Sequence, residues 1–223
     1  PGKPKPATFH WVNVPERLPR GCEHAVFRSP TLGVDVGYCV YLPPGYHEKV
    51  NAGRRYPVVY HLHGGRPGNE GKSVNLARFI HSAMLGAKVN PVIYIFANGG
   101  PVSWYNIPGN KNAQGEDVFV KELIPHVDRV YRTVSSRGGR AIEGFSQGGR
   151  GTSRIMFKYP ELFCSCAPGG SGYGPEKKIQ QNKGQESSHL KFAPGNDAWS
   201  LARNFASLKD RPKLAILIWC GDK

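Results

Sequence analysis

A serine flanked by glycines is the residue best suited to covalent chemistry in this chain. The stretch Gly144-Phe145-Ser146-Gln147-Gly148 has the form G-x-S-x-G and follows a short apolar run at 140–145. Helical spacing of apolar residues resumes after it, so Ser146 is predicted on a sharp strand-to-helix turn. Glycines on either side let the backbones approach closely, and the helix N-terminus favours negative charge near the hydroxyl. The pattern is typical of a serine nucleophile.

A second glycine-containing stretch, His61-Leu62-His63-Gly64-Gly65, ends another apolar run. Attack of a serine on a carbonyl group develops negative charge on its oxygen, and backbone N–H groups aimed at that oxygen stabilise it. We expect one such donor at Gln147, directly after the serine, and the other at Gly65. An ordinary tight turn is the alternative explanation for the Gly-Gly pair.

Short apolar runs alternate with amphipathic helices over most of the chain. The runs lie at 22–29, 34–42, 57–62, 91–97, 140–145, 163–168 and 214–220. Helices are expected at 73–85, at 117–131 with a kink at Pro125, from Ser146 to Pro160, and after Asp197. This alternation predicts an α/β fold with a mostly parallel sheet buried on both faces. We expect a single domain at 21–223, preceded by an extended proline-rich arm at 1–20.

Two of the predicted helices carry signals at their ends. Ser73 is placed to cap the first helix, and Gly86 is placed to end it. The apolar face of this helix is expected to comprise Leu76, Phe79, Ile80 and Ala83. Asp197 is placed to cap the last helix, which carries Ala202 and Phe205.

The composition excludes several classes of protein. The chain has 30 Lys+Arg against 16 Asp+Glu and a net charge of +14, but the basic residues are scattered and no nucleic-acid-binding motif occurs. No apolar run approaches the roughly 18 residues of a membrane span, and no histidine or cysteine pattern has metal-ligand spacing. We expect a basic solvated surface, no nucleic-acid partner, no membrane span and no metal. A secretory signal is either absent or already removed.

Five cysteines, an odd number, raise the question of a disulfide. Cys164, Cys166 and Cys220 lie in apolar runs and are expected to be buried small hydrophobic residues. If Pro30-Thr31 is the tip of a hairpin, Cys22 falls opposite Cys39. A disulfide between these two is then a hypothesis, and it would imply an oxidising compartment.

Several stretches, in a fixed order along residues 34–220, resemble α/β-hydrolase-fold esterases of the esterase-D type. This family includes feruloyl and acetylxylan esterases, S-formylglutathione hydrolases, enterochelin-esterase-like proteins and mycolyltransferases. The matching stretches are Tyr41-Leu-Pro-Pro-Gly-Tyr46, Tyr56-Pro-Val-Val-Tyr-His-Leu-His-Gly-Gly65, Ser103-Trp-Tyr105, Glu122-Leu-Ile-Pro125 with Tyr131-Arg-Thr133, Arg140-Ala-Ile-Glu-Gly-Phe-Ser-Gln-Gly-Gly149, and Tyr159-Pro-Glu-Leu-Phe163. The feruloyl/polysaccharide esterase branch fits best.

The resemblance implies an α/β-hydrolase three-layer sandwich and a serine carboxylester hydrolase without a cofactor. Ser146 would be the nucleophile, with Gly65 and Gln147 as oxyanion donors. The substrate would be a small-molecule or polysaccharide ester, with a feruloyl or acetyl ester of plant polysaccharide favoured, and the protein would be secreted or periplasmic. Another ester or thioester hydrolase of the same family, of the S-formylglutathione hydrolase or enterochelin esterase kind, is an alternative.

The chain departs from the family pattern at its end. Family members commonly read Cys-Gly-x-x-Asp, with the catalytic acid at the aspartate, whereas this chain reads Cys220-Gly221-Asp222-Lys223. The acid and the general-base histidine are therefore expected beyond Lys223, with a last strand and helix, and Asp222 is an alternative acid. His189 follows Ser146 but lies in a polar loop, where a solvated side chain is the simpler interpretation.

Some residues have two interpretations. Trp104 and Tyr105 could line an aromatic acyl pocket or pack in the core. Glu122 and Glu143 are interpreted as structural carboxylates. A non-catalytic module of the same fold, binding carbohydrate or a protein, is an alternative to the enzyme, although glycines around a strained serine have little use in a pure binder.

Overall fold

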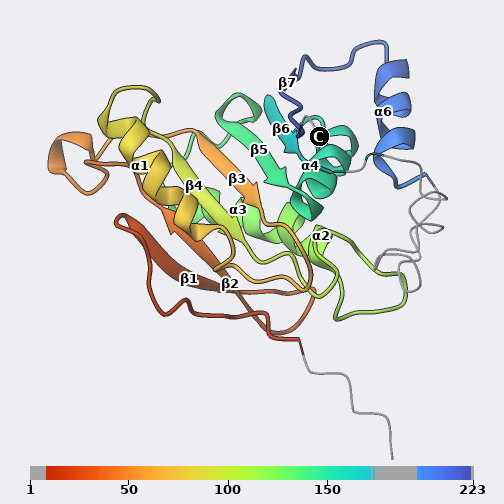
Figure 1. The fold of residues 1–223 in the computed structure, drawn as a ribbon, viewed down its shortest axis with the longest axis horizontal. Coiled ribbons are helices and arrows are strands. Elements are labelled where there is room, and N and C mark those ends of the chain that lie inside the picture. The colour runs from red at the N-terminus through yellow and green to blue at the C-terminus, as the bar shows by residue number, and fades with distance from the viewer. Residues whose placement is uncertain (1–8, 172, 174–194, 222–223) are drawn as a thin grey trace, which may run out of the picture.

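The computed structural model describes residues 9–171, 173 and 195–221, and its strands form one mixed sheet in the order β1-β2-β4-β3-β5-β6-β7 (Figure 1). The strands are β1 Cys22–Arg28, β2 Asp35–Tyr41, β3 Val58–Leu62, β4 Ile93–Ala97, β5 Arg140–Phe145, β6 Ser165–Gly169 and β7 Ala215–Ile216. β1, β2 and β4 pair antiparallel, whereas β4, β3, β5, β6 and β7 are parallel. The predicted mostly parallel sheet is confirmed.

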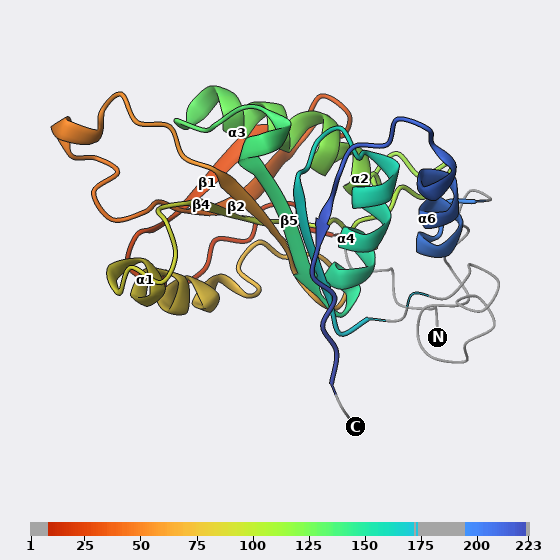
Figure 2. The same cartoon turned by 90° about the horizontal axis from the view of Figure 1, so that it is seen from above.

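Helices cover both faces of the sheet and give a three-layer α/β sandwich (Figure 2). Helix α1, Ala77–Leu85, lies on one face, and α3, Ile124–Val130, and α4, Gln147–Lys158, lie on the other. Helix α6, Ala198–Ser207, packs outside α4 through Phe157 and Phe205, whose ring centroids are 5.5 Å apart. As predicted, the side chain of Asp197 caps α6 by accepting a 2.9 Å hydrogen bond from the Ser200 N–H.

The first helix differs from its prediction at its start and on its buried face. A 3-10 turn, Val74–Leu76, precedes α1, and Ser73 makes no side-chain cap because it has a φ of 66°. The helix buries Ala77 and Met84, while Phe79 is 74% exposed. The predicted apolar face assumes continuous α-helical winding from Ser73. The 3-10 turn winds more tightly than an α-helix, so the residues after it point in different directions from those predicted.

The helix predicted at 117–131 is wound in three parts. Gly115–Asp117 forms α2, Val118–Leu123 is π-helical, and α3 follows with Pro125 in its first turn. Proline cannot donate the hydrogen bond that a continuous α-helix needs. The kink expected at Pro125 therefore takes the form of the wider π-helical turn that precedes it.

The β1–β2 hairpin excludes the predicted disulfide. Its turn is closed by Ser29 and Val34, one residue later along the chain than Pro30-Thr31 would place it. Cys22 therefore pairs with Tyr41, and Cys39 pairs with His24. All five cysteines are free thiols, so the disulfide hypothesis is wrong, and Cys220 is exposed rather than buried.

The topology brings two loops together at one edge of the sheet. β3 and β5 are parallel neighbours, but the chain leaves β3 towards α1 and β4, whereas it leaves β5 towards α4 and β6. Loops that diverge in this way open a crevice at the carboxyl ends of the strands, where α/β proteins bind ligands. Ser146 follows β5 and Gly64 follows β3, so both lie at this edge of the sheet, which we call the crevice.

A buried ion pair ties α4 to the short helix α2. Glu116 and Arg154 have 1% and 3% of their side chains exposed and lie 2.7 Å apart. Arg154 also donates to the carbonyls of Trp104 and Asn196, at 3.0 and 2.7 Å. Burial raises the pKa of Glu116, but the charges of Arg154 and Lys158 outweigh burial and hold the pKa below its ordinary value.

We predict that Arg154→Met lowers the free energy of unfolding by about 3–5 kcal/mol, because Glu116 would stay buried with one cation fewer. The matched control is Lys121→Met, which breaks the solvent-exposed pair with Asp117 and should cost less than about 1 kcal/mol. Urea unfolding measures both variants. Equal losses would contradict the prediction.

Candidate active site

Ser146 sits at the junction between β5 and α4 in a conformation that few residues adopt. Its φ is 55° and its ψ is −114°, and its side chain is exposed at the carboxyl end of the sheet. The Ser146 N–H donates to the Gly169 carbonyl at 2.9 Å, and its carbonyl accepts from the Arg150 N–H at 3.1 Å in the first turn of α4. A left-handed serine is costly, and such strain is found mainly at functional sites.

The two motif glycines let α4 start directly against the sheet. A Cβ atom on Gly148 would lie 1.8 Å from the carbonyl oxygen of Leu62 in β3. A Cβ on Gly144 would lie 2.6 Å from the backbone of Gly148. No side chain fits at either position, so the glycine spacing follows from the close approach of strand and helix.

The loop after β3 reaches the serine. A Cβ on Gly64 would lie 3.4 Å from the Ser146 Cβ and 3.1 Å from the Phe145 carbonyl oxygen. Gly65 is exposed and left-handed, with a φ of 70°, and Gln147 is buried as the first residue of α4. The structure therefore places Gly64, in the loop that follows β3, next to Ser146.

Trp104 and Tyr105 pack in the interior of the protein, which agrees with the core-packing interpretation of these two residues. Trp104 is completely buried against His63 and Phe119, and Tyr105 is 2% exposed. The guanidinium groups of Arg66 and Arg154 lie over the Tyr105 ring. These contacts give no support to an acyl pocket lined by the two aromatic side chains.

Two histidines near the crevice are occupied by structural contacts. His61 Nδ1 lies 3.0 Å from the Glu143 carboxylate, on the α1 face of the sheet. The His63 ring bonds the Gly64 carbonyl through Nδ1 and the Gly99 N–H through Nε2. Burial lowers the pKa of His63 to about 3, so its ring is neutral.

The general base and acid are not assigned within the described part of the chain. Among residues 9–171, 173 and 195–221, no histidine forms a hydrogen bond with the Ser146 side chain. His189 and Asp222, which the sequence raised as candidates, lie outside the described residues. The same described residues contain no cluster of His, Cys, Asp and Glu fit to hold a metal.

A buried carboxylate that the sequence analysis missed fixes the loop after β3. Glu70 is fully buried and accepts hydrogen bonds from Asn98 Nδ2, the Asn13 backbone and side chain, and His24 Nε2. It occupies the space that a side chain at Gly37 would need. In the sequence only the neighbouring Asn69 and Gly71 indicate a tight turn at this position. The hydrogen-bond partners of Glu70 are distant in sequence, so its role could not be predicted.

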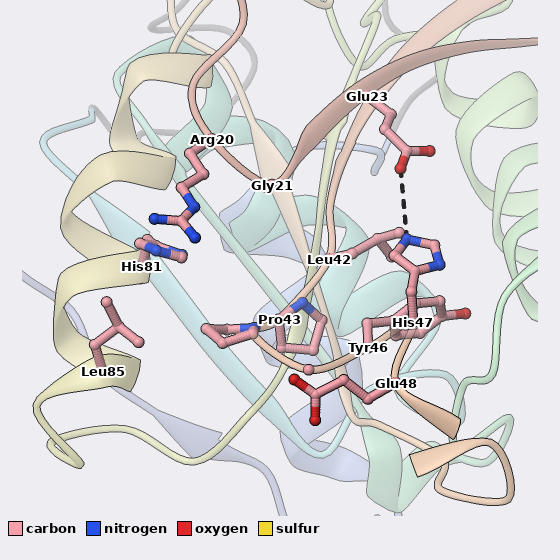
Figure 3. A pocket seen from close by; sticks show the side chains of 12 residues that line it. Arg20, Gly21, Glu23, Leu42, Pro43, Tyr46, His47, Glu48, His81 and Leu85 are labelled. Atoms are coloured by element: carbon pink, nitrogen blue, oxygen red, sulfur yellow. Dashed lines mark ion pairs between the residues drawn. The ribbon is translucent and has the colours of Figure 1, made fainter. Parts of the chain in front are cut away.

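A cavity of about 630 Å³ lies at the opposite edge of the sheet (Figure 3). Leu42, Pro43 and Tyr46 line it beside His47 and Glu23, whose Nε2 and Oε1 atoms are 3.7 Å apart. Because β2 is antiparallel to β4, its end lies where β4 begins, away from the carboxyl ends that carry Ser146. We therefore assign the candidate chemistry to the crevice and not to this cavity.

The model of the family described as "Putative esterase" matches residues 29–218 of the chain. The chain belongs to this family. An esterase of Mycobacterium tuberculosis is 32% identical over 146 residues, which are 63% of this chain and 30% of that protein. A protein of Xylanibacter ruminicola named endo-1,4-beta-xylanase/feruloyl esterase is 31% identical over 146 residues, 63% of this chain and 20% of that protein. The chain thus spans less than a third of each curated relative.

Solved structures of other esterases share the fold. A ferulic acid esterase superposes with a TM-score of 0.68 at 20% identity, over 85% of this chain and 73% of that one. A fluorophosphonate-binding serine hydrolase of Staphylococcus aureus gives 0.71 at 18% identity, over 90% and 79%. At these identities the likeness establishes the α/β-hydrolase-like fold of this esterase-family chain.

No helix among its described residues has the length and apolar character to cross a bilayer.

We predict that Gly148→Ala lowers the free energy of unfolding by about 3 kcal/mol or more, because the new Cβ cannot fit against the Leu62 carbonyl. The control is Gly53→Ala, since a Cβ there meets nothing within 4 Å. Thermal unfolding followed by circular dichroism compares the two. A Gly148→Ala protein as stable as the control would mean that α4 does not start against β3.

The buried His63 predicts a fall in stability in mild acid. The unfolded chain takes up a proton on this ring near pH 6.5 and the folded chain only near pH 3, so stability is lost as pH falls between these values. The loss attributable to His63 should reach roughly 2 kcal/mol at pH 5 relative to pH 7. Urea unfolding at both pH values tests this, and His63→Asn should reduce the difference by that amount. An unchanged difference in the variant would show that His63 does not carry it.

Proposed function

We propose that this chain carries the nucleophile and the oxyanion hole of a serine carboxylester hydrolase. The observation that carries the proposal is Ser146, exposed in a left-handed conformation at the start of α4 and directly beside Gly64. A nucleophilic hydroxyl needs this exposure, and donors for an oxyanion must lie next to it.

The reaction proceeds in two halves. Ser146 Oγ attacks the ester carbonyl while a general-base histidine takes its proton, and the N–H groups of Gly65 and Gln147 stabilise the oxyanion. The tetrahedral intermediate expels the alcohol, which receives that proton, and leaves an acyl group on Ser146. Water then attacks the acyl-enzyme with the same base and the same donors, and releases the acid. The general-base histidine and its acid partner are not assigned among residues 9–171, 173 and 195–221.

Feruloyl or acetyl esters of plant polysaccharide are the substrates that we favour. Relatives named ferulic acid esterase and endo-1,4-beta-xylanase/feruloyl esterase support this choice, and so does the order of the family stretches in the sequence. The structure of an S-formylglutathione hydrolase of Staphylococcus aureus superposes with a TM-score of 0.69 and supports a thioester as the alternative substrate. A polysaccharide substrate fits a secreted or periplasmic protein, which stays part of the proposal.

We predict that a fluorophosphonate labels the native gene product covalently at Ser146, with the label located by peptide mass spectrometry. Ser146→Ala should abolish labelling and lower turnover of para-nitrophenyl acetate at least about 1,000-fold. Ser136→Ala, at an exposed serine remote from the crevice, should change neither. A folded native protein that neither labels nor turns over esters would favour the non-catalytic module instead.

A further inference from the structure

Three consecutive carbonyl groups beside Ser146 are each held by a side chain. The carbonyl oxygen of His63 accepts a hydrogen bond from Trp104 Nε1 at 3.1 Å. The Gly64 carbonyl lies 3.0 Å from His63 Nδ1. The Gly65 carbonyl accepts from Ser103 Oγ at 2.9 Å. All three carbonyls of the loop are therefore directed at partners within the protein.

A held carbonyl also sets the direction of the next N–H group. In a trans peptide the C=O of one residue and the N–H of the next point in opposite directions within one plane. The bond to the Gly64 carbonyl therefore fixes the direction of the Gly65 N–H, and the bond to the Gly65 carbonyl fixes the following plane. Without these bonds two adjacent glycines could rotate freely, and a flipped plane would present an acceptor where a donor is needed.

The ring of His63 is suited to this role because its proton has a defined place. The Gly99 N–H donates to Nε2 at 3.2 Å, so Nε2 carries a lone pair and the proton resides on Nδ1. Nδ1–H then donates to the Gly64 carbonyl. Burial keeps the ring neutral by lowering its pKa to about 3, so this tautomer persists at the pH at which ester hydrolysis is measured.

The turn that supplies the other two donors is strained. Ser103 and Trp104 have φ values of 41° and 69°, both are completely buried, and neither is a glycine. Their N–H groups donate back to the carbonyls of Gly100 and Gly99, at 3.2 and 2.9 Å. Two consecutive left-handed residues are costly, and such strain persists where the position of the side chains matters.

We propose that Ser103, Trp104 and His63 are positioning residues: their bonds to the His63, Gly64 and Gly65 carbonyls fix the peptide planes on both sides of Gly65, so that the Gly65 N–H stays directed at the reacting carbonyl oxygen. The inference rests on the proposed function, because it assigns these residues to the same oxyanion hole. It predicts that they act on the transition state, where the oxyanion forms, and not on the binding of the ester.

Two serines with a left-handed backbone allow a matched test. Ser103→Gly removes the hydroxyl donor and also relieves the strained φ, so the variant should unfold within a few degrees of the native temperature. Its kcat for para-nitrophenyl acetate should fall about 10-fold or more, with KM unchanged. Ser73→Gly relieves a similar φ of 66°, and the Ser73 hydroxyl makes no cap hydrogen bond within the part of the chain that the structure describes, so the kcat of this variant should stay at the native value.

A transition-state analogue gives a second readout that a merely structural role would not move. Phenylboronic acid forms a tetrahedral adduct with a serine nucleophile, so its inhibition constant should rise in Ser103→Gly by the same factor as kcat falls. Two variants of His63 dissect the ring. His63→Asn keeps a donor near the Nδ1 position and should retain more kcat than His63→Gln, which places its amide near the Nε2 position.

The outcomes separate this inference from the function on which it rests. A native protein that turns over esters, with Ser103→Gly and Ser73→Gly equal in kcat and in boronate affinity, would overturn the positioning role alone. A selective loss in Ser103→Gly supports it. A native protein that neither labels nor hydrolyses any ester would overturn the proposed function, and the positioning role with it.

Discussion

The architecture of the crevice depends on one close approach, between the first turn of α4 and the end of β3. A side chain at Gly148 would overlap the Leu62 carbonyl, so helix and strand meet backbone to backbone. This contact sets where the helix begins, and hence where Ser146 turns out of β5. It also brings Gly64 to the serine, because the residues after Leu62 continue directly from the strand. Ser146 and the loop after β3 are thus positioned by a single packing constraint.

Buried polar groups, rather than apolar packing, fix the loops around this constraint. Glu70 joins the arm at Asn13 to Asn98 after β4, while Glu116 and Arg154 tie the short helix α2 to α4. Loops carry many backbone groups that a purely apolar interior could not satisfy. Breaking such a pair leaves a buried charge without compensation, so these loops resist local opening. A crevice lined with fixed dipoles needs little reorganisation when charge develops in it.

The sequence predicts those features that depend on residues close together in the chain. The turn at Ser146 and the cap at Asp197 follow from spacings of a few residues, and both appear in the structure. The pairing of Cys22 was missed because a hairpin turn shifted by one residue changes every partner on the opposite strand. The hydrogen bond from Ser103 to Gly65 could not be predicted, since it joins residues 38 positions apart. Short-range rules contain no information on such contacts.

In the proposed reaction an oxyanion forms twice, once when Ser146 is acylated and once when water attacks the acyl group. The acyl carbon stays bonded to Ser146 between these steps, so the same donors serve both only if they do not move. A positioning histidine that titrated near neutral pH would make the donors themselves pH-dependent. His63 avoids this because its pKa lies near 3 and its two ring nitrogens are already engaged. In the proposed mechanism the acid limb of the rate profile therefore reports the general base and not the titration of His63.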